Sequence, residues 1–64
     1  HCPGPLLEAI RLVRESSLGE TIAVITGDPS SRDIIPTWVQ RAGHRLEGVE
    51  AVHGGWRFSI TRNR

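Results

Sequence analysis

Apolar side chains recur at helical spacing in two separate stretches of this 64-residue chain. Across residues 5–16 they return every three or four positions, and charged side chains fill the opposite side. Residues 33–42 carry a second stripe of this kind, followed by Gly43, a residue type that commonly ends helices. We therefore predict two amphipathic helices, with Asp33 as the N-cap of the second and Pro36 in its first turn, where a missing N–H group costs little.

Three other stretches have the composition and alternation of β-strands. Residues 20–26 form an almost continuous β-branched run, which is typical of a central strand covered on at least one face. Residues 44–52 alternate imperfectly, and Gly48 marks the expected position of a β-bulge. Residues 56–61 alternate clearly, with apolar side chains on one face and polar ones on the other, and residues 53–55 supply the hairpin turn before them.

Composition and charge narrow the class of protein. The length fits one small domain, residues 1–64, and eight arginines against seven acidic residues give a net charge of +1. That balance offers no strong electrostatic case for binding nucleic acid, so direct nucleic-acid binding is not expected. The longest apolar run, residues 22–25, is far too short to span a membrane, and no targeting segment is visible.

The only cysteine, Cys2, directly precedes the first predicted helix and is the strongest candidate for chemistry. A helix N-terminus has unpaired N–H groups and the positive end of the macrodipole, both of which favour an anion such as a thiolate. Pro3 and Pro5 suit the first turn because they lack N–H groups, and Gly4 lets a partner atom approach closely. His1, when protonated, adds a positive charge beside the sulfur.

A single cysteine also limits the alternatives. It cannot form a disulfide within the chain, and a free thiol suits the reducing cytoplasm, where we expect the protein. Neither a metal nor a bound cofactor is expected, because Cys2 and the histidines lack the paired spacing of a metal site. A Cys–His pair would need His44 or His53 to fold over Cys2, which spacing alone leaves open. A redox sensor is disfavoured because the chain holds no second, resolving cysteine.

The segment Cys2-Pro3-Gly4-Pro5, which opens an amphipathic helix, resembles the Cys-Pro-x-Pro signature of the TusA/SirA-like sulfur-carrier family. The resemblance extends almost to the C-terminus, since further family motifs follow in order: Gly19-Glu20, Asp28-Pro29, Ile34-Ile35-Pro36, Trp38 and Gly43-His44. One position departs from the family pattern, because Ile34 stands where the family has an acidic residue before Ile-Pro, and Asp33 comes one place earlier.

The resemblance implies a fold. It is an α/β (α+β) two-layer sandwich with the element order β-α-β-α-β-β, in which both helices cover one face of a small mixed sheet. The family's first strand precedes the cysteine and is missing or truncated in this chain. The second face of the sheet is expected to be open.

The resemblance also implies a function, that of a sulfur carrier or sulfurtransferase in a sulfur relay. Cys2 would accept sulfane sulfur as a persulfide from a cysteine desulfurase or a rhodanese. It would pass the sulfur to a downstream relay or thiolation protein that serves tRNA thiolation, the molybdenum cofactor or sulfur metabolism. The implied docking surface surrounds Cys2 and the Asp-Pro turn, and its candidate partner contacts are Arg11, Asp28, Arg32 and Trp38.

An alternative from a different class stays open. A non-catalytic regulatory or protein/RNA-binding module would keep Cys2 as a structural residue and use the open sheet face for its partner. Trp38 likewise fits either a packing residue of the core or an aromatic anchor for a partner. Arginines and aromatics on opposite faces of residues 56–61 argue against an RNA-stacking platform.

Overall fold

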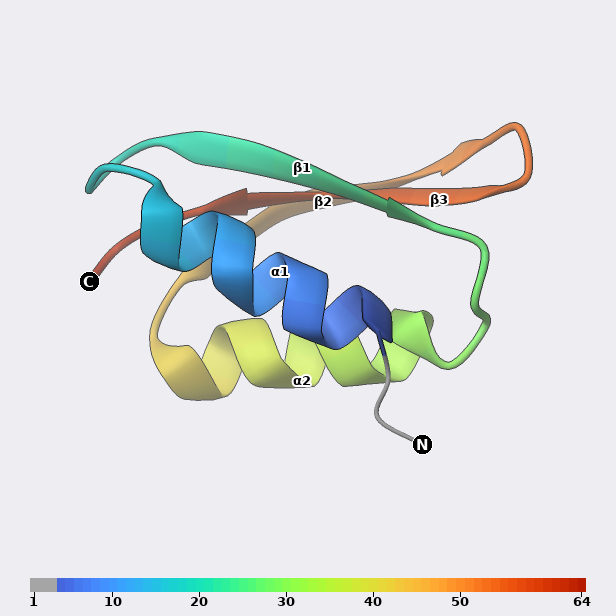
Figure 1. Cartoon of the computed structure of the whole chain (residues 1–64), viewed down its shortest axis with the longest axis horizontal. Helices are drawn as coiled ribbons and strands as arrows, with labels where there is room; N and C mark the ends of the chain where they lie inside the picture. Colours follow the sequence, from blue (N-terminus) through green and yellow to red (C-terminus); the bar gives the residue numbers. More distant parts are fainter. Residues whose placement is uncertain (1–3) are drawn as a thin grey trace.

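The computed structural model describes residues 4–64. In chain order the elements are α1 (Gly4–Glu15), β1 (Thr21–Thr26), α2 (Ser31–Ala42), β2 (Arg45–Val52) and β3 (Gly55–Thr61). Both helices lie on the same side of the strands, so the helices form one layer and the sheet forms the other (Figure 1). The predicted two-layer α+β sandwich is confirmed, while the predictions about His1, Cys2 and Pro3 lie outside the described residues.

The sheet has the strand order β1-β3-β2, and both pairings are antiparallel. The predicted mixed sheet is not found among the described strands, because both of their pairings are antiparallel and the parallel pairing was expected from a further strand that the resemblance implies. The prediction of a central strand at residues 20–26 is wrong for the described sheet, since β1 lies at an edge and β3 is central. A β-branched run does not distinguish an edge strand from a central one. Ile25 belongs to the run, yet it faces away from the helices and is 64% exposed.

The strand β2 contains the bulge predicted at Gly48. The register with β3 shifts between Leu46 and Gly48 and leaves Glu47 without a partner in β3. The inserted residue explains the imperfect alternation of residues 44–52, since it returns Val49 to the face on which Leu46 lies.

The core fills the space between the two layers. Its members are apolar, almost completely buried and in mutual contact: Ala9, Val13, Val24, Ile35, Val39, Phe58 and Ile60. The central strand β3 supplies Phe58 and Ile60, which have no exposed surface. This confirms the apolar face predicted for residues 56–61, because alternate residues of a strand share one face.

The start of α2 corrects two predictions. The helix begins at Ser31, so Asp33 lies within its first turn and is not the N-cap, and Pro36 lies inside the helix and not in its first turn. The preceding turn is closed by Asp28, whose Oδ1 accepts hydrogen bonds from the N–H (3.0 Å) and the hydroxyl (2.9 Å) of Ser30. Since this turn already fixes the chain, Ser30 itself has helical backbone angles. The helix ends at Gly43, which has a φ of +83°, as predicted.

The loops and turns that connect the elements lie at two opposite ends of the molecule. The helices α1 and α2 run in the same direction and start at one end, which also holds the β1–α2 loop and the β2–β3 turn (Figure 1). We call this the helix-start end. At the opposite end the Arg62 side chain donates hydrogen bonds to the carbonyl oxygens of Arg14 and Ser16. The Arg62 backbone pairs there with Gly19 and Glu20, so the C-terminal segment fastens the α1–β1 connection.

Candidate functional site

The helix α1 begins at Gly4, and Pro5 lies in its first turn, as predicted. No acidic side chain occurs in that turn, whereas the first turn of α2 contains Asp33. The positive end of α1 is therefore left without a neutralising carboxylate from its own first turn. Gly4 is exposed, and apart from its chain neighbours and the backbone of α1 itself, a methyl group added there would meet no described atom within 4 Å. The residues that precede this helix end in the sequence lie outside the described range: His1, Cys2 and Pro3.

An open groove of about 410 Å³ lies between α1 and α2, beside the first turn of α1. Both helices line this interhelical groove: Leu6, Asp33, Ile34, Thr37, Trp38 and Arg41. Leu6 and Ile34 are half-buried and stand outside the group of side chains packed against the buried core, whereas Trp38 belongs to it. The residue after Leu6, Leu7, is 52% exposed. Leu7 therefore presents apolar surface to solvent, although it does not line the groove.

Trp38 packs against the buried core, which is one of the two roles considered for it, and it also faces the groove. It contacts the buried core, and its ring centroid lies 5.6 Å from that of His44 with the two rings tilted by 52°. The side chain remains partly accessible, because it forms part of the groove wall. The same residue can therefore stabilise the fold and contact a partner.

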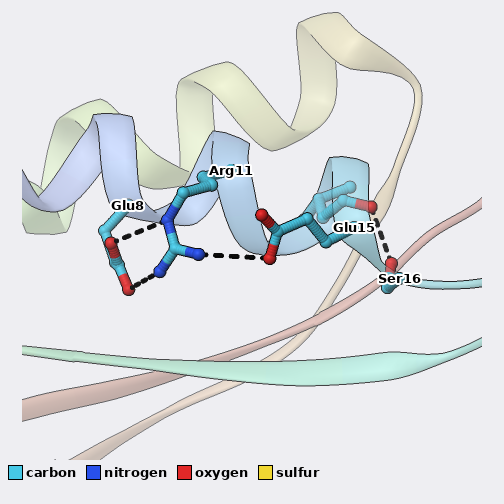
Figure 2. A network of polar contacts seen from close by, with 5 residues as sticks. Glu8, Arg11, Glu15 and Ser16 are labelled. Carbon is cyan, nitrogen blue, oxygen red and sulfur yellow. Dashed lines mark hydrogen bonds and ion pairs between the residues drawn. The ribbon is translucent and has the colours of Figure 1, made fainter.

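Arg11 lies on the exposed side of α1, where it is already held by two carboxylates (Figure 2). Its guanidinium contacts Glu8 at 2.6 Å and Glu15 at 3.1 Å. The hydrogen bond and the charge of Glu8, with a further contribution from Glu15, raise the pKa of Arg11. A partner that binds Arg11 must share it with these residues, so its role as a partner contact stays a prediction.

Asp28 and Arg32 also have partners within the chain. The Asp28 carboxylate is engaged with Ser30 in the turn before α2. The Arg32 guanidinium lies over the ring of Trp56, with 5.3 Å between its central carbon and the ring centroid, which is a cation–π distance. Neither side chain lines the interhelical groove. Their predicted contacts with a partner stay untested, and each has a structural role.

His44 and His53 lie at opposite ends of the molecule. His44 is in the α2–β2 connection, away from the helix-start end (Figure 1). Its Nδ1 accepts the N–H of Asn63 at 3.2 Å. Burial, and then the charges of Arg62 and Arg64, lower the pKa of His44. His53 lies in the β2–β3 turn at the helix-start end. Of the two residues considered as a partner for Cys2, His53 therefore lies at the end where α1 begins and His44 at the other end, and the pairing itself stays a prediction.

Sequence reasoning missed every groove residue except Trp38 as a site residue, namely Leu6, Asp33, Ile34, Thr37 and Arg41. Part of the signal is present in the sequence, because Ile34 and Arg41 stand four residues before and three after Trp38, a spacing that shares one helix face. Their meeting with Leu6 depends on how the two helices pack, which spacing does not encode.

Within residues 4–64, no three side chains of the types that bind metals are grouped closely enough to hold an ion. Among the helices of the same range, none has the length and apolar character needed to cross a bilayer.

Comparison with known proteins shows the family to which this chain belongs. Residues 1–62 match the family described as Sulfurtransferase TusA. A protein of Archaeoglobus fulgidus that is assigned as a sulfur carrier is 39% identical over 62 residues, covering 97% of this chain and 85% of that protein. The sulfur carrier protein TusA of Pseudomonas entomophila is 34% identical over 62 residues, covering 97% of this chain and 78% of that protein. No solved structure matches the chain significantly. The chain therefore belongs to the TusA family of sulfur carriers.

Proposed function

We propose that this chain carries sulfane sulfur as a persulfide on Cys2. A TusA-type sulfur carrier exchanges sulfur with donor and acceptor proteins, and it needs an atom on which the sulfur is held. Cys2 is the only thiol of the chain and stands two residues before the start of α1. The proposal rests on this position of the only thiol, in front of a helix whose first turn contains no carboxylate.

The transfer is a thiol–persulfide exchange with no net oxidation or reduction. The Cys2 thiolate attacks the outer sulfur of a donor persulfide, R–S–SH, and a bond from Sγ to that sulfur forms as the donor's S–S bond breaks. The electron pair of the broken bond stays on the donor, which leaves as the thiolate R–S⁻. The proton stays on the transferred sulfur, so Cys2 becomes Cys–S–SH. An acceptor thiolate then attacks this outer sulfur in the same way, and no metal or bound cofactor is required.

The helix α1 favours the ionised form of a thiol that precedes it. A helix N-terminus stabilises an adjacent anion by about 0.3–1 kcal/mol. Glu8 is the nearest carboxylate to Cys2 along the sequence, and its charge would oppose that effect. The ion pair with Arg11 offsets this charge. Arg11 thus supports the thiolate indirectly, by neutralising Glu8.

The proposed donor is a cysteine desulfurase or a rhodanese, and the proposed acceptor is a downstream sulfur-relay or thiolation protein. Both donor classes present sulfane sulfur as an enzyme-bound persulfide, which is the group that a thiolate can attack. The proposed location is the cytoplasm, because the Cys2 thiol must be kept reduced between transfers.

Intact mass spectrometry tests the proposal. After incubation with a cysteine desulfurase and L-cysteine, the wild-type chain should gain about one sulfur mass, and a reducing agent should remove it. The Cys2→Ser variant should gain none. It should also keep the melting temperature of the wild type, because the core residues of the described structure all lie between Ala9 and Ile60.

A sulfur gain that persists in Cys2→Ser would contradict the proposal. So would a wild-type chain that retains no sulfur on Cys2 from any persulfide or polysulfide donor. Binding of a protein or RNA partner that survives Cys2→Ser, without sulfur gain in either chain, would favour the non-catalytic module.

A further inference from the structure

The interhelical groove has an apolar floor that the fold leaves partly uncovered. Leu6, Ile34 and Trp38 supply this floor, and all three are only half-buried. Removing apolar surface from water is favourable. An apolar side chain of a partner therefore gains free energy by entering the groove.

The groove also has opposite charges along its α2 wall. Asp33 and Arg41 both line it and are eight residues apart on α2, which corresponds to about 12 Å along a helix at 1.5 Å per residue. Within residues 4–64 neither side chain has an ion-pair partner. By contrast, Arg11 and Arg57 contact carboxylates at 2.6 and 2.8 Å. The groove is therefore negatively charged near the start of α2, at Asp33, and positively charged near the end of α2, at Arg41.

The groove adjoins the segment that carries the reactive cysteine. Leu6 follows Cys2 by four residues, and four Cα–Cα steps of 3.8 Å span at most about 15 Å. A protein bound in the groove is therefore close enough to bring a cysteine-bound sulfur to Cys2.

We propose that the interhelical groove binds a segment of a cysteine desulfurase, as the sulfur donor, that presents an apolar side chain between a basic and an acidic residue. The basic residue pairs with Asp33 and the acidic residue with Arg41, about 12 Å away. An extended segment of about four residues, or a helical one of about eight, covers that distance. This inference rests on the proposed function, because it assigns the groove to the donor of the same transfer.

The chemistry of the groove favours a protein segment as its occupant. A nucleic-acid backbone presents a row of like negative charges, which Asp33 would repel at one end of the groove. The net charge of +1 gives no compensating attraction. An apolar floor between opposite charges instead resembles the centre and rim of a protein interface.

A charge swap tests the inference without changing the net charge. The variant Asp33→Arg/Arg41→Asp reverses the polarity of the groove, and the variant Arg45→Asp/Glu47→Arg makes the matching change on the exposed side of β2. Sulfur loading of Cys2 is followed by intact mass with two sources, a cysteine desulfurase with L-cysteine and inorganic polysulfide. Polysulfide needs no docking surface, so it measures the reactivity of Cys2 alone. Circular dichroism verifies that each variant is folded.

We expect the groove swap to slow loading from the desulfurase roughly tenfold at low ionic strength, because charges at an interface rim act mainly on the association rate. Added salt should reduce this difference. Loading from polysulfide should be equal in all folded variants, and the β2 swap should match the wild type with both sources.

Three results would overturn the docking inference. One is equal loading of the wild type and the groove swap by the desulfurase, and another is loading from polysulfide with none from the desulfurase. The third is a wild-type dimer in light scattering that the groove swap dissociates, since the occupant would then be a second copy of the chain. Failure of the wild type to hold sulfur from either source would instead refute the proposed function.

Discussion

Replacing Gly55 by alanine should remove a large part of the protein's stability. Gly55 begins β3, and a Cβ added there would overlap the carbonyl oxygen of Thr26. It would also lie 2.7 Å from the Thr26 carbonyl carbon and 2.9 Å from the Cα of Gly27. These atoms all belong to the backbone where β1 ends. The methyl group can therefore be accommodated only by moving one strand relative to the other.

The magnitude follows from the cost of overpacking. An extra methylene in a filled space costs typically 1–3 kcal/mol, and overlap with backbone places this variant near about 3 kcal/mol. A chain of 64 residues has roughly 3–10 kcal/mol of total stability. Each kcal/mol lowers the melting temperature of such a domain by about 4–8 °C. We therefore expect Gly55→Ala to melt roughly 10–25 °C below the wild type.

Thermal unfolding followed by circular dichroism measures this change, with Gly48→Ala as the matched control. A Cβ at Gly48 would have no atom of the described residues within 4 Å, although this glycine also lies in a strand. The control should melt within about 5 °C of the wild type, because alanine in a strand is not intrinsically worse than glycine. A Gly55→Ala protein that melts as high as the control would refute the argument from the Thr26 contact.

Two further predictions concern the end of the molecule opposite the helix starts. Burial is the main cause that lowers the pKa of His44, so the imidazole binds a proton more readily in the unfolded state than in the folded state. The neutral, buried His44 therefore contributes fully to the free energy of unfolding above about pH 6.5, and this contribution is lost as the pH falls through the lower folded-state pKa. Urea denaturation at about pH 7.5 and about pH 5 should show a smaller acid-induced loss in His44→Gln than in the wild type, and equal losses would contradict this assignment. Arg62→Ala should lower the free energy of unfolding by about 1.5–3 kcal/mol, because it removes charged donors from the carbonyls of Arg14 and Ser16. Equal urea midpoints for Arg62→Ala and for the exposed-site control Arg45→Ala would show that these hydrogen bonds add no stability.

The regular elements could be predicted because their patterns depend on which face is covered. Residues 56–61 alternate since Phe58 and Ile60 enter the core, and the helical stripe around Val39 follows from the same rule. The same pattern could not distinguish an edge strand of the sheet from a central strand. The strand β1 exposes Ile25 on its open face, so its composition suggests more coverage than it has.

The start of α2 shows how a local contact can override a good capping signal. Asp33 has a favoured N-cap side chain, but the Asp28 carboxylate closes a turn on Ser30 first, and the helix begins at Ser31. Side-chain competition of this kind depends on the path of the preceding strand, which the sequence pattern does not describe.

The candidate site, too, could be predicted from the sequence only in part. Cys2 could be singled out because it is the only thiol and precedes a predicted helix. The pairing of Arg11 could also have been predicted, since Glu8 and Glu15 stand three residues before and four after it. The interhelical groove could not, because it exists only where Leu6 of one helix meets the α2 wall.

The position of the C-terminal segment separates two properties of this carrier. Arg62 fastens the end at which α1 finishes and β1 begins, whereas both helices start at the other end (Figure 1). Under the proposed function, the residues that fasten the C-terminal segment are thus different from those proposed to contact other proteins. The helix-start end can change through evolution to suit a new donor or acceptor while the fastened end keeps the same fold.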